Sequence, residues 1–308
     1  MTGFRVIKGG ILSLLQDTGR LRYQHLGVTR GGPLDAKSAS WANRLLDNHP
    51  DAAVIEVTAG GLELESRTQT MVAVTGGDLN LTVNGEPQPP WRSFWVRQGD
   101  RLKFATPRYG FRAYIAVSGG FQTKLVLGSR SSVQRDHLGG VGGKGSALKA
   151  GDELPCGHLQ EETLSREIPM QYLPEISQEL VLHLIPGYQQ HEFGKEAWQT
   201  VWHSEFTLSQ NSNRMGARLE GPEVKTPAQS FLSEGVSYGA VQVPANGQPI
   251  IMLEDRQTLG GYPKLGNILP LDGFRLAQCT PGAKIRFQPM SLAEGQQQMR
   301  RYLRFFGL

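Results

Sequence analysis

Most apolar residues of this chain fall in short runs, many of them alternating with polar residues, and the runs are bounded by Gly, Pro, Asn or Asp. Alternation with a period of two is typical of strands that bury one face. The pattern predicts strands at residues 4–9, 62–66, 70–76, 79–85, 93–99, 101–105, 112–119, 180–187, 205–210, 240–244, 248–254, 274–279 and 284–289. Such regular punctuation favours barrels or sandwiches over alternating strand–helix units.

Three short segments are predicted to separate consecutive strands. Asn84-Gly85 has the clearest signal, because this dipeptide favours the tight turn of a two-residue hairpin. Residues 98–100 (QGD) and 280–282 (TPG) are interpreted in the same way.

Few segments have the period of a helix. Asp35 is placed to cap a helix within residues 36–48, whose apolar residues share one face. Residues 193–204 are a second candidate, and Ser291 with Glu294 forms a capping box at the start of a C-terminal helix. We therefore expect a mainly β fold with a few helices.

The length of 308 residues suggests about two domains. Residues 149–155 close a first set of strands, and a second set begins at residue 180, so we place a boundary between 165 and 178. The expected organisation is an N-terminal β-rich domain of residues 1–170 and a C-terminal β-rich domain of residues 171–308.

Composition narrows the classes of function. The net charge is +4 and the positive residues are spread along the chain, so we expect no nucleic-acid binding and favour an anionic small ligand or an acidic partner. The N-terminus lacks the apolar segment of a signal peptide and no run of about 18 apolar residues follows, so we expect a soluble, cytoplasmic protein with no membrane contact. Cys156 and Cys279 lack CxxC spacing, and no metal-ligand spacing is present.

The densest polar segment is QDTGRLRYQHLGVTRGGPLD, residues 16–35. Asp17 and Arg20 are spaced so that a turn can pair their carboxylate and guanidinium groups. Two interpretations stay open. The pair braces the loop, or Gln16, Asp17 and Arg20 border a polar cleft in which glycines let the backbone approach a ligand.

Two further polar clusters follow strands in the second half. Residues 209–216, SQNSNRMG, place six polar residues before a glycine, and such groups must bond to one another, to water or to a ligand. Arg214 in this segment suits a carboxylate or a phosphate. In residues 254–264, EDRQTLGGYPK, two glycines allow close backbone approach, and Lys264 could bind an anion or move a proton.

Some sequence motifs are weaker evidence of function. Residues 140–145 match GxGxxG, but no long strand precedes them and no amphipathic helix follows. Their glycine-rich backbone could still form a nest for an anion. The sequence contains no Met-Lys-Met motif, so we do not expect the chain to carry biotin itself.

Taken together, the clusters resemble the family of allophanate hydrolase subunit 2-like proteins, also described as biotin-dependent carboxyltransferase-family proteins or as the C subunit of 5-oxoprolinase. The similarity is carried by LLQDTGRLRYQHLGVTRGGPLD, VLGSRSSVQRDHLGGVGGKGSALKAGD, LSQNSNRMGARLEGP and GAVQVPANGQPIIMLEDRQTLGGYPKLG, and extends from about residue 6 to about residue 290. The chain departs from the family pattern at Arg22, at residues 133–140 and 265–266, and at Leu259, where a Thr is usual.

The resemblance implies a fold of two tandem barrel-like domains with cyclophilin-like features. It also implies a partner, a homologue of the B subunit of 5-oxoprolinase, which is similar to allophanate hydrolase subunit 1. Together with an A subunit, that complex opens 5-oxoproline to glutamate with hydrolysis of ATP.

Two alternatives remain open within the same resemblance. In fused urea carboxylases the corresponding modules move CO2 from carboxybiotin, held on a separate carrier, to urea. Other members are described as antagonists of a kinase inhibitor that is itself a homologue of the B subunit. Neighbouring genes for a biotin carrier or for an A subunit would separate the two enzyme functions.

Urea and the lactam of 5-oxoproline are both small planar amides, so a site for either needs donors for a carbonyl oxygen and an acceptor for N–H. Negative charge that develops on the amide would be stabilised by cationic groups such as Arg214 and Lys264. We expect catalytic roles for Lys264, Tyr262, Gln257 and Arg214, and substrate-binding roles for Asn213, Gln16, Asp17, Arg20, Asp35 and Asp255.

Overall fold

The computed structural model describes residues 3–157, 164–227 and 231–308. The chain divides into two compact units. The first contains Met1–Leu21 and Gly31–Ile176, and the second contains Arg22–Arg30 and Ser177–Leu308. Residues 22–30 thus leave the unit that precedes them in the chain and pack with the C-terminal one, which no local sequence pattern predicts.

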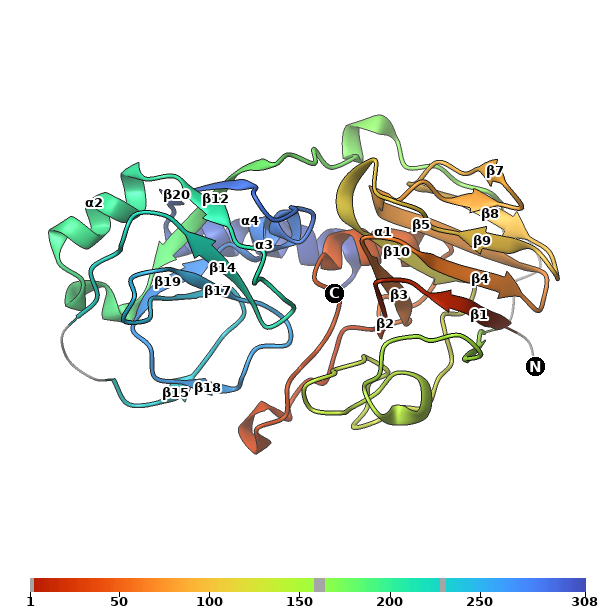
Figure 1. Cartoon of the computed structure of the whole chain (residues 1–308), viewed down its shortest axis with the longest axis horizontal. Coiled ribbons are helices and arrows are strands. Elements are labelled where there is room, and N and C mark those ends of the chain that lie inside the picture. The colour runs from red at the N-terminus through yellow and green to blue at the C-terminus, as the bar shows by residue number, and fades with distance from the viewer. Residues whose placement is uncertain (1–2, 158–163, 228–230) are drawn as a thin grey trace. The chain divides into compact units, whose positions relative to one another are not determined.

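Two antiparallel sheets build the first unit (Figure 1). The six-stranded sheet has the order β11 (Glu153–Pro155), β1 (Gly3–Gly9), β4 (Leu62–Ser66), β9 (Arg101–Lys103), β6 (Thr82–Val83) and β7 (Glu86–Pro87). The five-stranded sheet has the order β2 (Leu12–Gln16), β3 (Val54–Thr58), β10 (Tyr109–Val117), β5 (Thr70–Asp78) and β8 (Arg92–Val96).

The two sheets share one hydrophobic core, to which β1, β4 and β9 contribute from one sheet and β3, β5 and β10 from the other. Helix α1 (Ala36–Leu45) packs on β5 and β10. Its predicted cap is confirmed, because Asp35 accepts a hydrogen bond from the backbone N–H of Ser38 at 3.0 Å. Asn84-Gly85 also forms the predicted hairpin turn, between β6 and β7, with both residues at positive φ.

Residues 98–100 separate two strands, β8 and β9, as predicted, but these strands do not pair as a hairpin. β8 lies in the five-stranded sheet and β9 in the six-stranded sheet, so this turn carries the chain from one sheet to the other. A local turn signal does not encode which strand each neighbour will pair with, because pairing depends on residues distant in the chain.

A closed seven-stranded barrel forms the second unit. Around the barrel lie β12 (Glu179–Pro186), β19 (Lys264–Ile268), β16 (Ala240–Gln242), β17 (Ile250–Met252), β14 (Gly216–Glu220), β13 (Phe206–Leu208) and β20 (Lys284–Pro289). Only β12 and β20 pair in parallel among these strands. A small two-stranded sheet of β15 (Glu234–Gly235) and β18 (Leu259–Gly260) accompanies the barrel.

Three α-helices belong to the described part of the second unit: α2 (Lys195–His203), α3 (Pro270–Leu276) and α4 (Leu292–Phe306). The capping box of Ser291 and Glu294 is present at the start of α4. Short 3-10 turns are η1 (Gln24–Leu26) and η4 (Tyr188–Glu192) in this unit, and η2 (Val141–Gly143) and η3 (Met170–Tyr172) in the first. Within the described ranges, no helix combines the length and apolar character needed to cross a bilayer.

The strand predicted at residues 274–279 is wrong, because helix α3 occupies the first part of this segment. Pro270 occupies its first turn, and Asp272 accepts a hydrogen bond from the backbone N–H of His183 at 2.7 Å, which attaches the helix to β12. A short alternating run such as FRLAQC fits one face of a short helix as well as one face of a strand, so periodicity alone could not decide.

Candidate functional site

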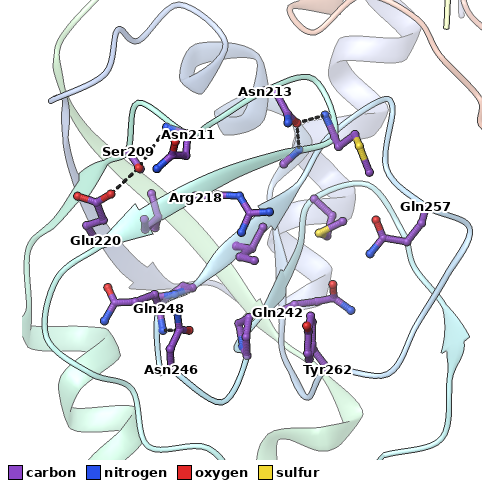
Figure 2. A pocket seen from close by; sticks show the side chains of 17 residues that line it. Ser209, Asn211, Asn213, Arg218, Glu220, Gln242, Asn246, Gln248, Gln257 and Tyr262 are labelled. Carbon is purple, nitrogen blue, oxygen red and sulfur yellow. Dashed lines mark hydrogen bonds between the residues drawn. The ribbon is translucent and has the colours of Figure 1, made fainter. Parts of the chain in front are cut away.

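A pocket of about 480 Å³ opens on the second unit (Figure 2). Residues of β14, β16 and β17, of the loop that precedes β14 and of the segments that follow β16 and β17 line it. Three of the predicted site residues, Asn213, Gln257 and Tyr262, lie in this lining although they are separated by up to 49 positions in the chain. The pocket is therefore the place where the 209–216 and 254–264 clusters meet.

Strand register explains which side chains face the pocket. Arg218 on β14 is paired with Ile250 on β17, which in turn is paired with Gln242 on β16. Gln242 is paired on its other side with Lys264 on β19. Residues paired across strands point to the same face of a sheet, so Arg218, Ile250, Gln242 and Lys264 form one row across four strands. We call these four residues the cross-strand row.

Asn213 shapes the rim of the pocket. Its side-chain oxygen accepts hydrogen bonds from the backbone N–H groups of Met215 at 2.8 Å and Gly216 at 3.3 Å. This turn ends the 209–216 loop and starts β14. Because the side-chain oxygen is held by the loop, the amide N–H2 of Asn213 is the part of this residue that a ligand could use.

Arg214 and Asp255 lie behind the lining, not in it. Both side chains are less than a tenth exposed, and they form an ion pair with each other. The backbone N–H of Asp255 also donates to the carbonyl oxygen of Arg214 at 2.9 Å. The structure thus brings these two predicted residues together, and their pairing joins the two loops that carry Asn213 and Gln257.

Gln242 is a site residue that the sequence interpretation missed. It is 1% exposed, it lines the pocket, and its side-chain nitrogen has no hydrogen-bond partner among the described residues. A Cβ at Gly260 would lie only 2.9 Å from that nitrogen, so the glycine allows the β18 backbone to approach Gln242. A buried amide donor without a partner is costly, and at a pocket wall it suggests a ligand acceptor.

Lys264 lies at the end of the cross-strand row and outside the described lining of the pocket. Its Nζ is 2.7 Å from the Oε1 of Glu234, and it lies 5.5 Å from the ring centre of Tyr188. The hydroxyl of Tyr188 also donates to Glu234, and the side-chain N–H of Gln189 does so at 2.8 Å.

These contacts shift the pKa values of Glu234 and Tyr188. Burial alone would raise the pKa of Glu234, but hydrogen bonds from Lys264 and Tyr188 outweigh it, so the pKa lies below its ordinary value. The hydrogen bond to Glu234 raises the pKa of the Tyr188 phenol. Lys264 therefore faces a carboxylate that stays ionised.

Residues 22–30 pack against the same unit. The side chain of Gln24 donates to the carbonyl oxygen of Val236 at 3.3 Å, and Thr29, 1% exposed, donates to the carbonyl oxygen of Arg256 at 3.5 Å. In the same unit, burial raises the pKa of the Glu254 carboxyl group and lowers the pKa of the Arg256 guanidinium. The segment predicted to border a cleft therefore contributes part of its length to the second unit.

Gln16, Asp17 and Arg20 belong to the first unit, where they brace the loop of residues 126–132. Asp17 accepts hydrogen bonds from the hydroxyls of Ser129 at 2.5 Å and Ser131 at 2.7 Å. Arg20 is 2% exposed and donates to the carbonyl oxygen of Ser131 at 2.7 Å.

The side chains of Gln16 and Asp35 also make hydrogen bonds to other parts of the first unit. The side chain of Gln16 donates to the carbonyl oxygen of Ser132 at 3.1 Å and accepts from the N–H of Gly32 at 3.0 Å. Asp35 is the cap of α1. These contacts connect the opening segment with residues of the first unit that are distant in the chain.

Neither the pocket nor the glycine-rich segment of residues 140–145 suits the triphosphate of ATP. Arg218 is the one cation in the described lining of the pocket, and Glu220 adds an acid beside it. In the glycine-rich segment 140–145, the N–H groups of Gly140, Gly143 and Gly145 already donate to backbone carbonyls. A triphosphate needs several cations or unused N–H donors, so we assign no nucleotide contact to these residues.

Comparison with known proteins supplies further findings. Residues 26–289 match the protein family described as carboxyltransferase domain, subdomain A and B. The chain is 34% identical over 304 residues to the C subunit of 5-oxoprolinase from Escherichia coli K12, and the alignment covers 98% of this chain and 96% of that relative.

Two solved structures are also similar. Kluyveromyces lactis urea carboxylase has a TM-score of 0.91 and 27% identity, covering 98% of this chain and 29% of that one. TTHA0988 has a TM-score of 0.84 and 34% identity, covering 94% of this chain and 55% of that one. The chain thus spans about half or less of these solved chains. The matches confirm the resemblance drawn from the motifs and the expected β-rich, barrel-containing fold.

Proposed function

We propose a function from one premise: this chain belongs to the carboxyltransferase domain family, subdomains A and B. It acts as the C subunit of an ATP-dependent 5-oxoprolinase, which opens 5-oxoproline to glutamate together with homologues of the A and B subunits. The observation that carries this proposal is the alignment with the Escherichia coli relative, which spans 98% of one chain and 96% of the other. Two chains that match end to end are expected to play the same part in a complex.

The pocket supports an amide as the substrate. Asn213, Gln242 and Gln257 carry side-chain amides and Tyr262 a hydroxyl, all in one lining. These groups can donate to a carbonyl oxygen and accept from an amide N–H, which a planar lactam presents on one edge. The pocket would therefore hold the lactam group by hydrogen bonds from several directions.

Lys264 is assigned the role of an electrostatic stabiliser. In the cross-strand row its backbone is paired with that of Gln242, whose side chain lines the pocket. Negative charge that develops on the amide oxygen during ring opening would be stabilised by a cation at that position. Arg214 and Asp255 act as positioning residues, because their ion pair holds the loops of Asn213 and Gln257.

ATP use belongs to the assembled complex. When bound, ATP supplies the activation that makes opening of a stable lactam favourable. Since the residues of this pocket do not suit a triphosphate, we propose that another polypeptide of the complex holds the nucleotide and that this chain binds and orients the amide.

The test is reconstitution. The chain is co-expressed with its homologues of the A and B subunits, and ATP-dependent glutamate release from 5-oxoproline is measured, with each of the three polypeptides omitted in turn as the control. Release that requires all three polypeptides and ATP is the expected result. Absence of release from a complex that assembles would contradict the proposal.

A second candidate is favoured by the TM-score of 0.91 with Kluyveromyces lactis urea carboxylase. In that case the chain would be a carboxyltransferase module acting on urea or a related amide. The amide-bearing wall of the pocket also suits the planar ureido group of a biotin held on a separate carrier. The same complex is therefore assayed with urea and carboxybiotin, and carboxylation of urea without glutamate release would select this second function.

A further inference from the structure

We propose that Arg218 binds a carboxylate group of the substrate, so that the pocket is built for an amide that also carries an acid. The proposal rests on the proposed function, because it names the substrate class of the same pocket. Arg218 lies on β14 at an exposed position, whereas its neighbours in the strand, Ala217 and Leu219, are buried. Its side chain therefore projects from the outer face of the barrel.

The guanidinium of Arg218 has no partner within the described part of the protein. No ion pair or hydrogen bond joins it to another described residue, although its backbone N–H is held by the hydroxyl of Ser212 at 3.0 Å. Glu220 lies two residues further on, but its carboxylate accepts from Ser209 and is drawn at the opposite side of the pocket from Gln257 (Figure 2). Arg218 thus presents its donors to the pocket, and a guanidinium binds a carboxylate through two parallel hydrogen bonds.

The cross-strand row matches the groups of a lactam acid in order. Gln242 offers a buried amide nitrogen without a partner among the described residues, Ile250 follows with an apolar side chain, and Arg218 comes next. Two strand spacings separate the Cα atoms of Gln242 and Arg218, which is roughly 10 Å, and both side chains can reach a small molecule lying over Ile250. The lactam would face Gln242, the ring methylenes would cover Ile250, and the carboxylate would meet Arg218.

This arrangement discriminates between the two enzyme functions. 5-Oxoproline has an amide, two methylenes and a carboxylate, so it uses all three positions of the row. Urea has only the amide, so it would leave Ile250 uncovered and Arg218 without a partner. A site with a buried polar group rejects a ligand that lacks the matching group, because the unmatched group is left unsatisfied.

The experiment compares two lactams in the assembled complex of three polypeptides: 5-oxoproline and 2-pyrrolidinone, which has the same ring without the carboxylate. Binding is measured by calorimetry and turnover by ring opening, for the natural protein and for Arg218→Gln and Arg218→Lys. Arg300→Gln, a change at an exposed arginine of α4, serves as the matched control. A second variant, Gln242→Met, removes the amide contact and keeps a side chain of similar length.

The expected result is that Arg218→Gln weakens binding of 5-oxoproline by about tenfold or more, the effect of losing hydrogen bonds between charged groups, and changes 2-pyrrolidinone by less than about twofold. Arg218→Lys should retain part of the affinity, and Gln242→Met should weaken both lactams alike. An equal effect of Arg218→Gln on the two lactams, or none on 5-oxoproline, overturns the proposal. So does a complex that binds neither lactam.

The two proposals fail separately. A complex that binds 5-oxoproline through Arg218 but does not open it contradicts the proposed function and leaves the carboxylate site standing. A complex that opens 5-oxoproline with the same KM in Arg218→Gln supports the function and removes this role of Arg218.

Discussion

Arg214 and Asp255 are joined by a two-point ion pair, in which Nε lies 2.9 Å from Oδ2 and Nη2 lies 3.0 Å from Oδ1. Their side chains are 6% and 7% exposed, so the pair is closed to solvent. It connects the loop that precedes β14 with the loop that follows β17, and both loops carry residues of the pocket. The geometry of the pocket therefore depends on a contact that does not itself line it.

Removing one member of this pair should strongly destabilise the protein. Arg214→Ala or Asp255→Ala leaves a charge buried without its partner, which typically costs about 3–5 kcal/mol in the free energy of unfolding. The measurement is urea denaturation followed by circular dichroism. Arg286→Ala is the control, because it breaks the solvent-exposed pair with Glu205 and should change stability little.

The double variant Arg214→Met with Asp255→Leu separates charge from packing. If the cost of a single variant comes from the unpaired charge, the double variant should lose less stability than the sum of the losses measured for Arg214→Met and Asp255→Leu separately. A fully additive loss would show that the two side chains act independently.

Lys264→Ala should lower turnover of the assembled complex by about a hundredfold or more, the usual effect of removing a group that stabilises developing charge. Lys264→Arg should retain part of the activity. Lys284→Ala, at an exposed position on β20, is the control and should keep full turnover. Unchanged glutamate release from Lys264→Ala, in a complex that still assembles, would remove Lys264 from the mechanism.

The ion pair of Glu234 should make stability depend on pH on the acid side. Because the pKa of Glu234 is lowered in the folded protein, its contribution is fully present above the ordinary value of 4.5 and is lost as pH falls through the folded-state pKa. The difference in unfolding free energy between the natural protein and Glu234→Gln should thus be constant from neutral pH to about pH 5 and shrink below it. A difference that stays constant at lower pH would show that ionisation of Glu234 is not its source.

Two variants of Asp35 distinguish capping from substrate binding. Asp35→Ala removes the cap of α1 and should cost about 1 kcal/mol, within the usual range of roughly 0.5–2. Asp35→Ser keeps a capping oxygen for the N–H of Ser38 and removes the carboxylate, so it should restore stability. If Asp35 also contacts the substrate, Asp35→Ser will fold normally and still lose activity, which the glutamate assay detects.

Local signals located many of the elements. The hairpin at Asn84-Gly85 and the helix ends at Asp35 and Ser291 depend on residues a few positions apart, and all three are present. The strand predicted at residues 274–279 was wrong because a six-residue apolar pattern does not distinguish a strand from helix α3. The predicted strand at residues 79–85 is reduced to Thr82–Val83.

The sequence by itself located polar clusters that adjoin strands, and one of these clusters, residues 209–216, contains Asn213 and Arg214. Only the tertiary structure decided which arginine faces the pocket. Arg214 is buried against Asp255, while Arg218, four residues later, projects from β14 beside Ile250 and Gln242. The reason is physical. The face of the sheet on which a strand residue lies depends on the register with strands that are distant in the chain, and a local polar sequence does not specify that register.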